Sequence, residues 1–471
     1  MNDSHGYLEK HPEYYWVDGK EIYREAGGYA TISQYFKQAR NENPGGVIAL
    51  DNGDTIHGTF AAVNNQGRDM VKILNELNFD AWTAHWEFAY GPDNLKNISE
   101  KLNYPLLAIN CYNEKNKNLA YKPYRVVEKR GIRFGLVGIA SNIVDKTMPD
   151  SFSKDHYFTL GKEELPGYIN KLKQDESADI VIVFSHLGYP QELKLAKETD
   201  GIDILLSGHT HNRIYKPVIV NETVLIQSGC HGSFLGRLDI QIENGSITNW
   251  DHKLVSMDRS IGQDPVVKDM IDEILSPHRS MLNELVGETV KPLTRNRVIE
   301  STMDNLLLKS LLEETGADIA FSNGWRYGAP IPPGDITIND LWNIVPVNPP
   351  VSVCEITGKE IKKMLEEDME NTFSADPYNQ MGGFLKRCKG IYIYFKIENP
   401  PGKRIQEFYI GGKKVEMNKS YKATFVTSQG IPKKFGDNRT NLDIKAIGAL
   451  RKYIKRKKTL SIGFDDNIVP I

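Results

Sequence analysis

The sequence predicts an α/β protein built from two domains. Its 471 residues suggest two or three domains at ordinary domain sizes. Short apolar runs alternate with amphipathic helical patterns in the first half, and helices mix with alternating strands in the second. We therefore expect an α/β layered domain over residues 1–262, a connecting helix over 263–285 and an α+β domain over 286–471.

The apolar runs of the first half are the expected strands of a buried sheet. Residues 180–184 read Ile-Val-Ile-Val-Phe, and 47–50, 134–138 and 202–206 are similarly apolar. Strands that helices cover on both faces have this near-continuous character. Helical patterns, such as 70–77 and 164–173, lie between them. This alternation is typical of an α/β layered domain.

The second half has a different order of elements. Pro265 stands at a plausible first-turn position of the connecting helix. Beyond it, the pattern predicts helices at 301–315 and 358–368, a strand at 317–321, a turn-rich segment at 328–335 and a strand at 390–397.

Composition excludes several classes of function. The net charge of −3 leaves no electrostatic footprint for nucleic acid, and the basic run 451–458 is short enough to be a solvated helix end. No stretch reaches the roughly 18 apolar residues of a membrane span. The cysteines form no CxxC pair, which argues against a disulfide framework or a cysteine zinc site; they are Cys111, Cys230, Cys354 and Cys388.

Aspartate and histidine side chains follow the predicted strands directly. In an open α/β sheet the carboxyl ends of the strands line one crevice, so these side chains can meet there. Such a cluster without a cation would leave polar groups stranded, whereas carboxylate and imidazole are good ligands for zinc, manganese and iron. A carboxylate can bridge two metals, and Asp54 is suited to that role. The cluster comprises Asp3, His5, Asp54, His85, His186, His209 and His211.

Each part of this pattern alone has a simpler explanation. Asp3 and His5 can be a surface pair, Gly53-Asp54 a turn, and His186 a core histidine. Their occurrence together, in this order, favours a site for two divalent metal ions. His231 lies in a glycine-bounded loop that could border the site. The remaining histidines lack strand-end placement and are expected to be structural or exposed; they are His11, His57, His156, His252 and His278.

With these motifs the chain resembles the calcineurin-like metallophosphoesterases, and within them the 5'-nucleotidase family. The resemblance spans nearly the whole chain. It implies a four-layer metallophosphoesterase sandwich followed by a C-terminal α+β domain of 5'-nucleotidase type. The matching segments are 2–6, 51–54, 87–88, 185–188, 208–212, 235–238, 316–320, 322–324, 333–337 and 355–358.

The resemblance also assigns roles to residues. It implies that Asp54 is shared by two metals, with Asp54 and His85 at the catalytic centre. One metal would be held by Asp3, His5, Asp54 and His211, and the other by Asp54, His85, His186 and His209. In the C-terminal domain, Arg326 matches an arginine that the family uses on the substrate, and Asn323 stands close to it. A simpler interpretation of Arg326 is that it forms a salt bridge at the surface.

Three departures from the family pattern bear on function. The nucleotidase motif Gly-Asn-His-Glu-Phe-Asp reads here Ala84-His85-Trp86-Glu87-Phe88-Ala89, so a ligand is replaced by His85 and the usual proton donor by Trp86. Loss of a general acid typically costs roughly 10²–10⁴-fold in rate. The His-Trp-Glu-Phe motif and segment 376–383 are instead similar to the SoxB thiosulfohydrolase branch. The late Gly-Gly-Asp segment that helps to sandwich the base is not recognisable, and the candidate aromatic platforms are Tyr327, Tyr378 and Phe384.

The family also has a strand before Asn2-Asp3, which this sequence lacks. Either the start is trimmed or misassigned, which we favour, or the crevice is built differently. Members of the family are mostly exported, but no export signal is recognisable here, so the compartment stays open between export and the cytoplasm.

Three functions are consistent with the sequence. The first is hydrolysis of a phosphoester of a nucleotide or related metabolite. The second is hydrolysis of a sulfur ester or thiosulfonate on a carrier, where a thiolate-like group leaves without protonation. The third is a metal-containing binding protein with vestigial catalysis. Turnover separates the third from the other two.

Overall fold

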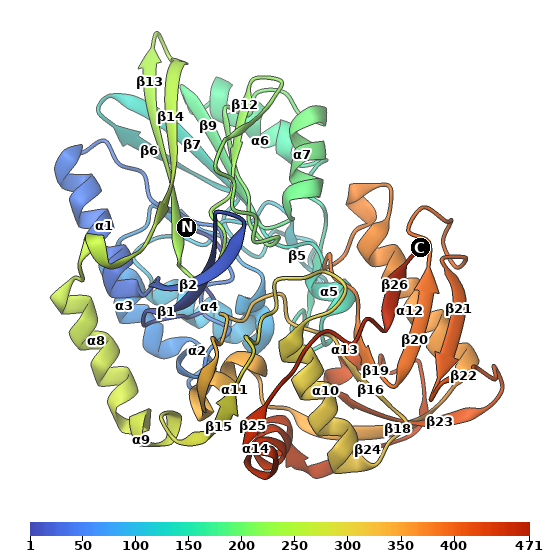
Figure 1. Cartoon of the computed structure of the whole chain (residues 1–471). Helices are drawn as coiled ribbons and strands as arrows, with labels where there is room; N and C mark the ends of the chain where they lie inside the picture. Colours follow the sequence, from blue (N-terminus) through green and yellow to red (C-terminus); the bar gives the residue numbers. More distant parts are fainter. The chain divides into compact units, whose positions relative to one another are not determined.

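The computed structural model describes residues 1–471 and divides into two compact units, Met1–Pro277 and His278–Ile471. Figure 1 shows the elements of both units along the chain. No helix in the chain is both long and apolar enough to cross a membrane.

A six-stranded mixed sheet forms the centre of the first unit. Its strand order is β11-β12-β10-β9-β7-β6, with the four inner strands parallel and both edge strands antiparallel to their neighbours. The strands are β6 (Tyr124–Lys129), β7 (Ile132–Ile139), β9 (Ile180–Ser185), β10 (Ile204–Leu206), β11 (Val218–Val220) and β12 (Thr223–Ile226). Three of these strands, β7, β9 and β10, coincide with predicted apolar runs at 134–138, 180–184 and 202–206, which confirms the mixed α/β fold.

Both faces of this sheet are buried, which explains its continuous apolar strands. Val181 and Val183 of β9 pack with apolar residues of α6 (Leu165–Gln174) and α7 (Tyr189–Glu198). Ile182 and Phe184 face the opposite side, where β3 (Leu50–Asp51), β4 (Ala81–Trp82) and β13 (Phe234–Glu243) contribute to the same apolar cluster. Successive residues of a strand point to opposite faces, so each face needs its own apolar set.

Smaller elements complete the first unit. The helices α1, α3 and α8 contact one another on one flank, and the β13–β14 hairpin projects from the body (Figure 1). The predicted strand at 47–50 is shorter than expected, because only its last residue pairs, in β3. The elements are β1 (His11–Val17), β2 (Lys20–Ala26), α1 (Tyr29–Glu42), α2 (Phe60–Asn64), α3 (Val71–Leu77), α4 (Pro92–Lys101), β5 (Cys111–Asn113), α5 (Val144–Thr147), β8 (His156–Phe158), β14 (Ser246–Ser256) and α8 (Pro265–Leu275).

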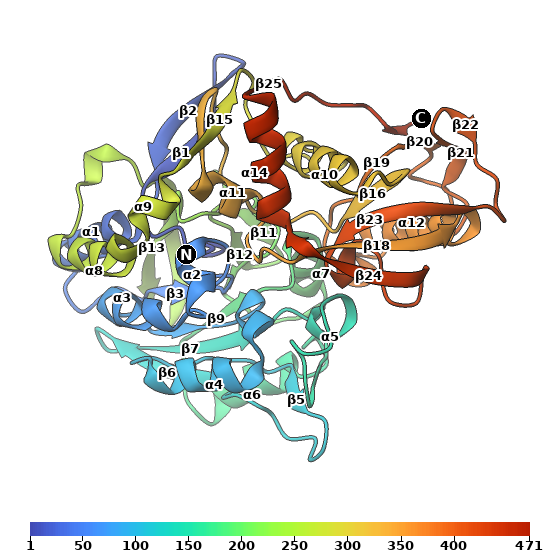
Figure 2. The same cartoon turned by 90° about the horizontal axis from the view of Figure 1, so that it is seen from below.

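The second unit contains three sheets and a helical layer. The largest sheet has the order β19-β16-β23-β18-β24. Helix α10 lies beside α14 (Figure 2). The helices are α9 (Arg279–Leu282), α10 (Thr302–Thr315), α11 (Ile338–Ile344), α12 (Gly358–Phe373), α13 (Thr427–Gly430) and α14 (Ala446–Lys457). The strands are β15 (Leu285–Thr289), β16 (Ile319–Ser322), β17 (Gly334–Thr337), β18 (Pro350–Thr357), β19 (Arg387–Lys389), β20 (Ile391–Phe395), β21 (Ile405–Ile410), β22 (Lys413–Lys414), β23 (Ser420–Val426), β24 (Asp437–Lys445), β25 (Thr459–Leu460) and β26 (Ile468–Pro470).

Side-chain caps explain where the main helices of this unit begin. Ser301 accepts a hydrogen bond from the Asp304 N–H at the start of α10. Thr357 and Glu360 form a reciprocal capping box at the start of α12. Such caps satisfy N–H groups that the first helical turn leaves without partners.

The basic run forms the end of α14 and keeps its expected exposure. Lys452 pairs with Glu314 at 2.8 Å, and Lys455 pairs with Glu284 at 2.8 Å. The run is therefore a solvated helix end whose charges are balanced within the unit.

Candidate metal centre

The candidate ligands stand at the ends of strands in the first unit. Residues 1–3 lie alongside residues 51–53, because the Asn52 N–H donates to the Met1 carbonyl and the Asp3 N–H to the Gly53 carbonyl, both at 2.9 Å. His186 directly follows β9, and His209 follows β10 after two residues. The parallel strands thus deliver these side chains to one edge of the sheet.

The structure brings all seven predicted metal ligands into two groups that share one carboxylate. The ligand atoms within each group lie within 4.8 Å of one another. The first group is Asp3, His5, Asp54 and His211, and the second is Asp54, His85, His186 and His209.

Asp54 lies at the junction of the two groups. Its Oδ2 is 3.1 Å from His186 Nε2, 3.1 Å from His85 Nδ1 and 3.7 Å from His5 Nε2. Asp3 Oδ1 is 3.1 Å from His211 Nε2 and 3.6 Å from His186 Nε2. Carboxylates therefore alternate with imidazoles, which is an arrangement suited to bridging two cations.

Backbone strain is concentrated at these residues. A positive φ is uncommon outside glycine and costs about 1–2 kcal/mol per residue. Strain of this kind persists only where the surrounding structure enforces it, and it clusters at functional sites. Five of the seven candidates have a left-handed backbone: Asp3 (φ 51°), His5 (49°), Asp54 (56°), His209 (68°) and His211 (60°).

The electrostatics of the cluster favour a bound cation. Burial would raise the pKa of Asp54, but His85, His186 and His5 together hold it well below its ordinary value. Burial lowers the pKa of His5 well below its ordinary value. The ring atoms His85 Nε2 and His186 Nε2 are buried without a hydrogen-bond partner. Burial would lower the pKa of His186, but Asp54 and Asp3 raise it to about 10. A cation bound between these carboxylates would take the place of that proton, and imidazole with carboxylate is a donor set that fits divalent transition metals.

Trp86 lies beside this centre, and its indole ring does not transfer protons near pH 7. Its backbone N–H donates to Asp54 Oδ1 at 2.8 Å, and its ring stacks on the His57 ring at 4.6 Å with an interplanar angle of 5°. Burial lowers the pKa of His57 to about 3, so that imidazole is neutral near pH 7. Neither ring of the stack can act as a general acid at neutral pH.

His231 borders the first group without belonging to it. The backbone N–H of His231 donates to the Asp3 carbonyl at 2.7 Å, and the centre of its ring lies 6.5 Å from the centre of the His5 ring. Together with Glu13 and Cys230 it forms a third set of closely spaced donors. Arg213 pairs with Glu13 at 2.8 Å and already supplies a positive charge there. Burial would raise the pKa of Glu13, but His231 and Arg213 lower it to about 2.

The predicted substrate residues all lie in the second unit. The Arg326 guanidinium is 5.5 Å from the Phe384 ring centre, within cation–π range. Asn323 accepts a hydrogen bond from the Thr427 hydroxyl at 3.0 Å. Tyr378 is half-buried in a short 3₁₀ helix, whereas Tyr327 is 1% exposed and packs as core.

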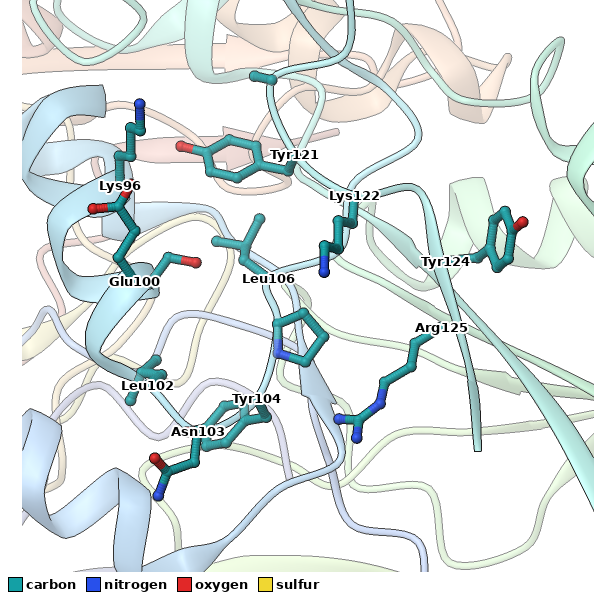
Figure 3. A pocket seen from close by; sticks show the side chains of 13 residues that line it. Lys96, Glu100, Leu102, Asn103, Tyr104, Leu106, Tyr121, Lys122, Tyr124 and Arg125 are labelled. Carbon is teal, nitrogen blue, oxygen red and sulfur yellow. The ribbon is translucent and has the colours of Figure 1, made fainter. Parts of the chain in front are cut away.

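A cavity of about 660 Å³ lies elsewhere in the first unit. Lys96, Tyr121, Lys122 and Arg125 are among the side chains around it (Figure 3). None of the seven candidate ligands lines it, so it is separate from the metal centre.

Two buried side chains to which the sequence assigned no role hold the ligand loops. Glu87 accepts hydrogen bonds from the His85 N–H at 2.7 Å and the Asp54 N–H at 3.2 Å. Gln227 bonds to the loop that carries His209 and His211. In the sequence, Glu87 stands within the motif at 84–89, whereas nothing there marks Gln227.

Comparisons with known proteins agree with this fold. Residues 284–428 match the sequence model of the 5'-nucleotidase C-terminal domain. The trifunctional nucleotide phosphoesterase protein YfkN of Bacillus subtilis is 27% identical over 422 residues, which cover 79% of this chain and 28% of that protein. A 5'-nucleotidase of Vibrio parahaemolyticus is 22% identical, covering 90% of this chain and 81% of its own length.

Two solved structures share the fold of the whole chain. The sulfate thiohydrolase SoxB of Thermus thermophilus, in complex with glycerol, aligns with a TM-score of 0.89 and 24% identity, covering 95% of this chain and 83% of SoxB. A 5'-nucleotidase precursor of Thermus thermophilus aligns with a TM-score of 0.87 and 21% identity, covering 100% of this chain and 98% of its own.

The fold is thus that of a calcineurin-like phosphoesterase followed by a 5'-nucleotidase C-terminal domain. In sequence and fold the chain is similar to the calcineurin-like 5'-nucleotidase family.

Proposed function

We propose that this chain is a dinuclear metal-dependent hydrolase that cleaves a phosphoester of a nucleotide or related metabolite. The observation that carries the proposal is the pair of buried Asp/His groups joined at Asp54. When bound, two divalent ions such as manganese, zinc or iron supply a water of lowered pKa and polarise the ester. The relatives named for nucleotide phosphoesterase and 5'-nucleotidase activity favour this substrate class.

In this proposal the chain's own residues orient the reaction. Asp54 fixes the two groups relative to each other, and His85 serves as a ligand. Arg326 and Phe384 offer a cation and an aromatic face, which suit an oxyanion and a flat base. Hydrolysis forms a bond from water oxygen to phosphorus and breaks the bond to the leaving oxygen, which must then take up a proton.

The test is phosphate release by manganese-loaded protein from a panel of nucleotides and simple phosphomonoesters. Metal-dependent release that is lost in His211→Ala supports the proposal. No release from protein that is shown to hold two metals refutes the phosphoester assignment.

A second candidate rests on Trp86. Because Trp86 and His57 cannot protonate a leaving oxygen, the site favours groups that leave as stable anions. A sulfur ester or thiosulfonate on a carrier is such a substrate, and SoxB shares the fold. A series of aryl phosphates and thiosulfonates of graded leaving-group pKa separates the candidates. A steep rate decrease with leaving-group pKa, relieved in Trp86→His, favours the second candidate.

A metal-containing binding protein with vestigial catalysis is the third reading. It predicts two bound metals and no turnover of any member of either substrate series. Turnover above the His211→Ala control therefore excludes it.

A further inference from the structure

One short loop supplies a histidine to each metal group. Residues 207–212 connect β10 to the next segment, with His209 in one group and His211 in the other. The conformation of this loop therefore sets how the two groups are placed relative to each other.

This loop is held in a strained conformation. Both His209 and His211 have positive φ, at 68° and 60°. Two left-handed residues separated by a single residue are costly, and such strain needs contacts that enforce it. Within the loop, the Thr210 N–H donates to the Gly208 carbonyl at 2.7 Å, which tightens the turn but does not attach it to the sheet.

Backbone hydrogen bonds attach the two ends of the loop, from the Ser207 N–H to the Ile226 carbonyl and from the Gly229 N–H to the Asn212 carbonyl, both at 2.9 Å. Between these ends, the attachment comes from the side chain of Gln227.

Gln227 follows β12, the parallel neighbour of β10, and is 1% exposed. Its amide nitrogen, which carries two N–H groups, lies within hydrogen-bond distance of three acceptors: Ser207 Oγ at 2.8 Å, Thr210 Oγ1 at 3.1 Å and the Gly208 carbonyl. Its amide oxygen accepts from the Asn212 N–H.

Only a side chain with both donors and acceptors can make this set of bonds. An amide carries two N–H donors and one carbonyl oxygen, which here face opposite ends of the loop. Gln227 lies outside both metal groups, so its polar atoms serve the loop and not a ligand.

We propose that Gln227 is a positioning residue that holds His209 and His211 in the geometry needed to bind two metals together. This inference rests on the dinuclear site of the proposed function. Residues that orient metal ligands typically change metal affinity about 10–100-fold when they are replaced.

The test compares Gln227→Met, which keeps the shape and removes the polar bonds, with Gln227→Glu, which keeps only the acceptors. Thr223→Val is the matched control, because Thr223 lies on the same strand and donates to the Ile202 carbonyl at 2.8 Å, away from the ligand loops. Manganese affinity and stoichiometry are measured by titration of metal-free protein. Cobalt(II) absorption spectra report the ligand geometry.

We expect Gln227→Met to weaken at least one metal affinity about 10–100-fold and to alter the cobalt spectrum. We expect Gln227→Glu to weaken it as well, and Thr223→Val to retain wild-type affinity and spectrum. If Gln227→Met does not fold, the manganese affinity and cobalt(II) spectrum of Gln227→Glu test the inference instead.

Unchanged affinity and spectrum in the folded Gln227 variants would overturn the inference and leave the proposed function standing. Equal weakening in Thr223→Val would also overturn it, because the effect would then be general destabilisation. Failure of the wild-type protein to bind two metals would overturn the proposed function, and this inference with it.

Discussion

Replacing Glu87 with glutamine tests how the second metal group is assembled. The Glu87 carboxylate is fully buried and accepts four backbone N–H groups. Its Oε2 accepts from His85 at 2.7 Å and Asp54 at 3.2 Å, and its Oε1 from Thr55 at 2.6 Å and Ile56 at 3.4 Å. One side chain thus joins the segment after β3 to the segment after β4.

The magnitude follows from the number of acceptors lost. A glutamine offers one oxygen, so two of the four N–H groups face an amide nitrogen that cannot accept. A buried N–H left unsatisfied costs about 1–3 kcal/mol, so Glu87→Gln should lose about 2–6 kcal/mol of stability. That is a large share of the about 5–15 kcal/mol that stabilises an ordinary domain.

The assay is urea unfolding of metal-free protein, followed by manganese titration of the folded variant. Glu366→Gln is the matched control in the second unit, where Glu366 accepts from the Arg404 N–H at 3.0 Å and the Ile405 N–H at 2.8 Å. Both variants should lose stability, but only Glu87→Gln should lose metal affinity. Wild-type stability and affinity in Glu87→Gln would refute the reasoning.

Three further predictions concern pH, capping and metal removal. Burial raises the pKa of Glu192 to about 7, so its contribution to stability is present below about pH 4.5 and lost as pH rises through 7. That change is worth about 3 kcal/mol. Glu192→Gln should therefore lower the difference between urea midpoints at pH 4.5 and pH 8, and an unchanged difference would contradict this. Ser301→Ala should cost about 1 kcal/mol by removing the α10 cap, without changing metal affinity, as denaturant unfolding and titration would show. A chelator should lower the melting temperature of wild-type protein more than that of Asp54→Ala, because the variant binds fewer ions; equal shifts would count against the site.

The strand-end pattern predicted which side chains gather in one place, because it depends on topology alone. Parallel strands β9 and β10 end at one edge of the sheet, and the histidines that follow them must meet there. The expected β/α alternation also follows from local periodicity. The same reasoning could not find Glu87, because hydrogen bonds to the N–H groups of Asp54 depend on how two loops approach each other.

Contacts between residues far apart in the chain were the second feature that the sequence could not predict. Lys452 forms an ion pair with Glu314, which is 138 residues away in the chain. No local sequence pattern predicts a partner at that separation. The sequence could not show which aromatic candidates are available to a substrate. Tyr327 is buried in the core, whereas Phe384 lies against Arg326. Burial of a ring depends on tertiary packing that a sequence window does not contain.

Metal stoichiometry tests the central claim most directly. Protein dialysed against manganese and then freed of unbound ion is analysed for metal per chain, with Asp54→Ala alongside. The shared carboxylate predicts two ions per wild-type chain and fewer than two in the variant. One ion or none in the wild type, or two in Asp54→Ala, would contradict a dinuclear centre joined at Asp54.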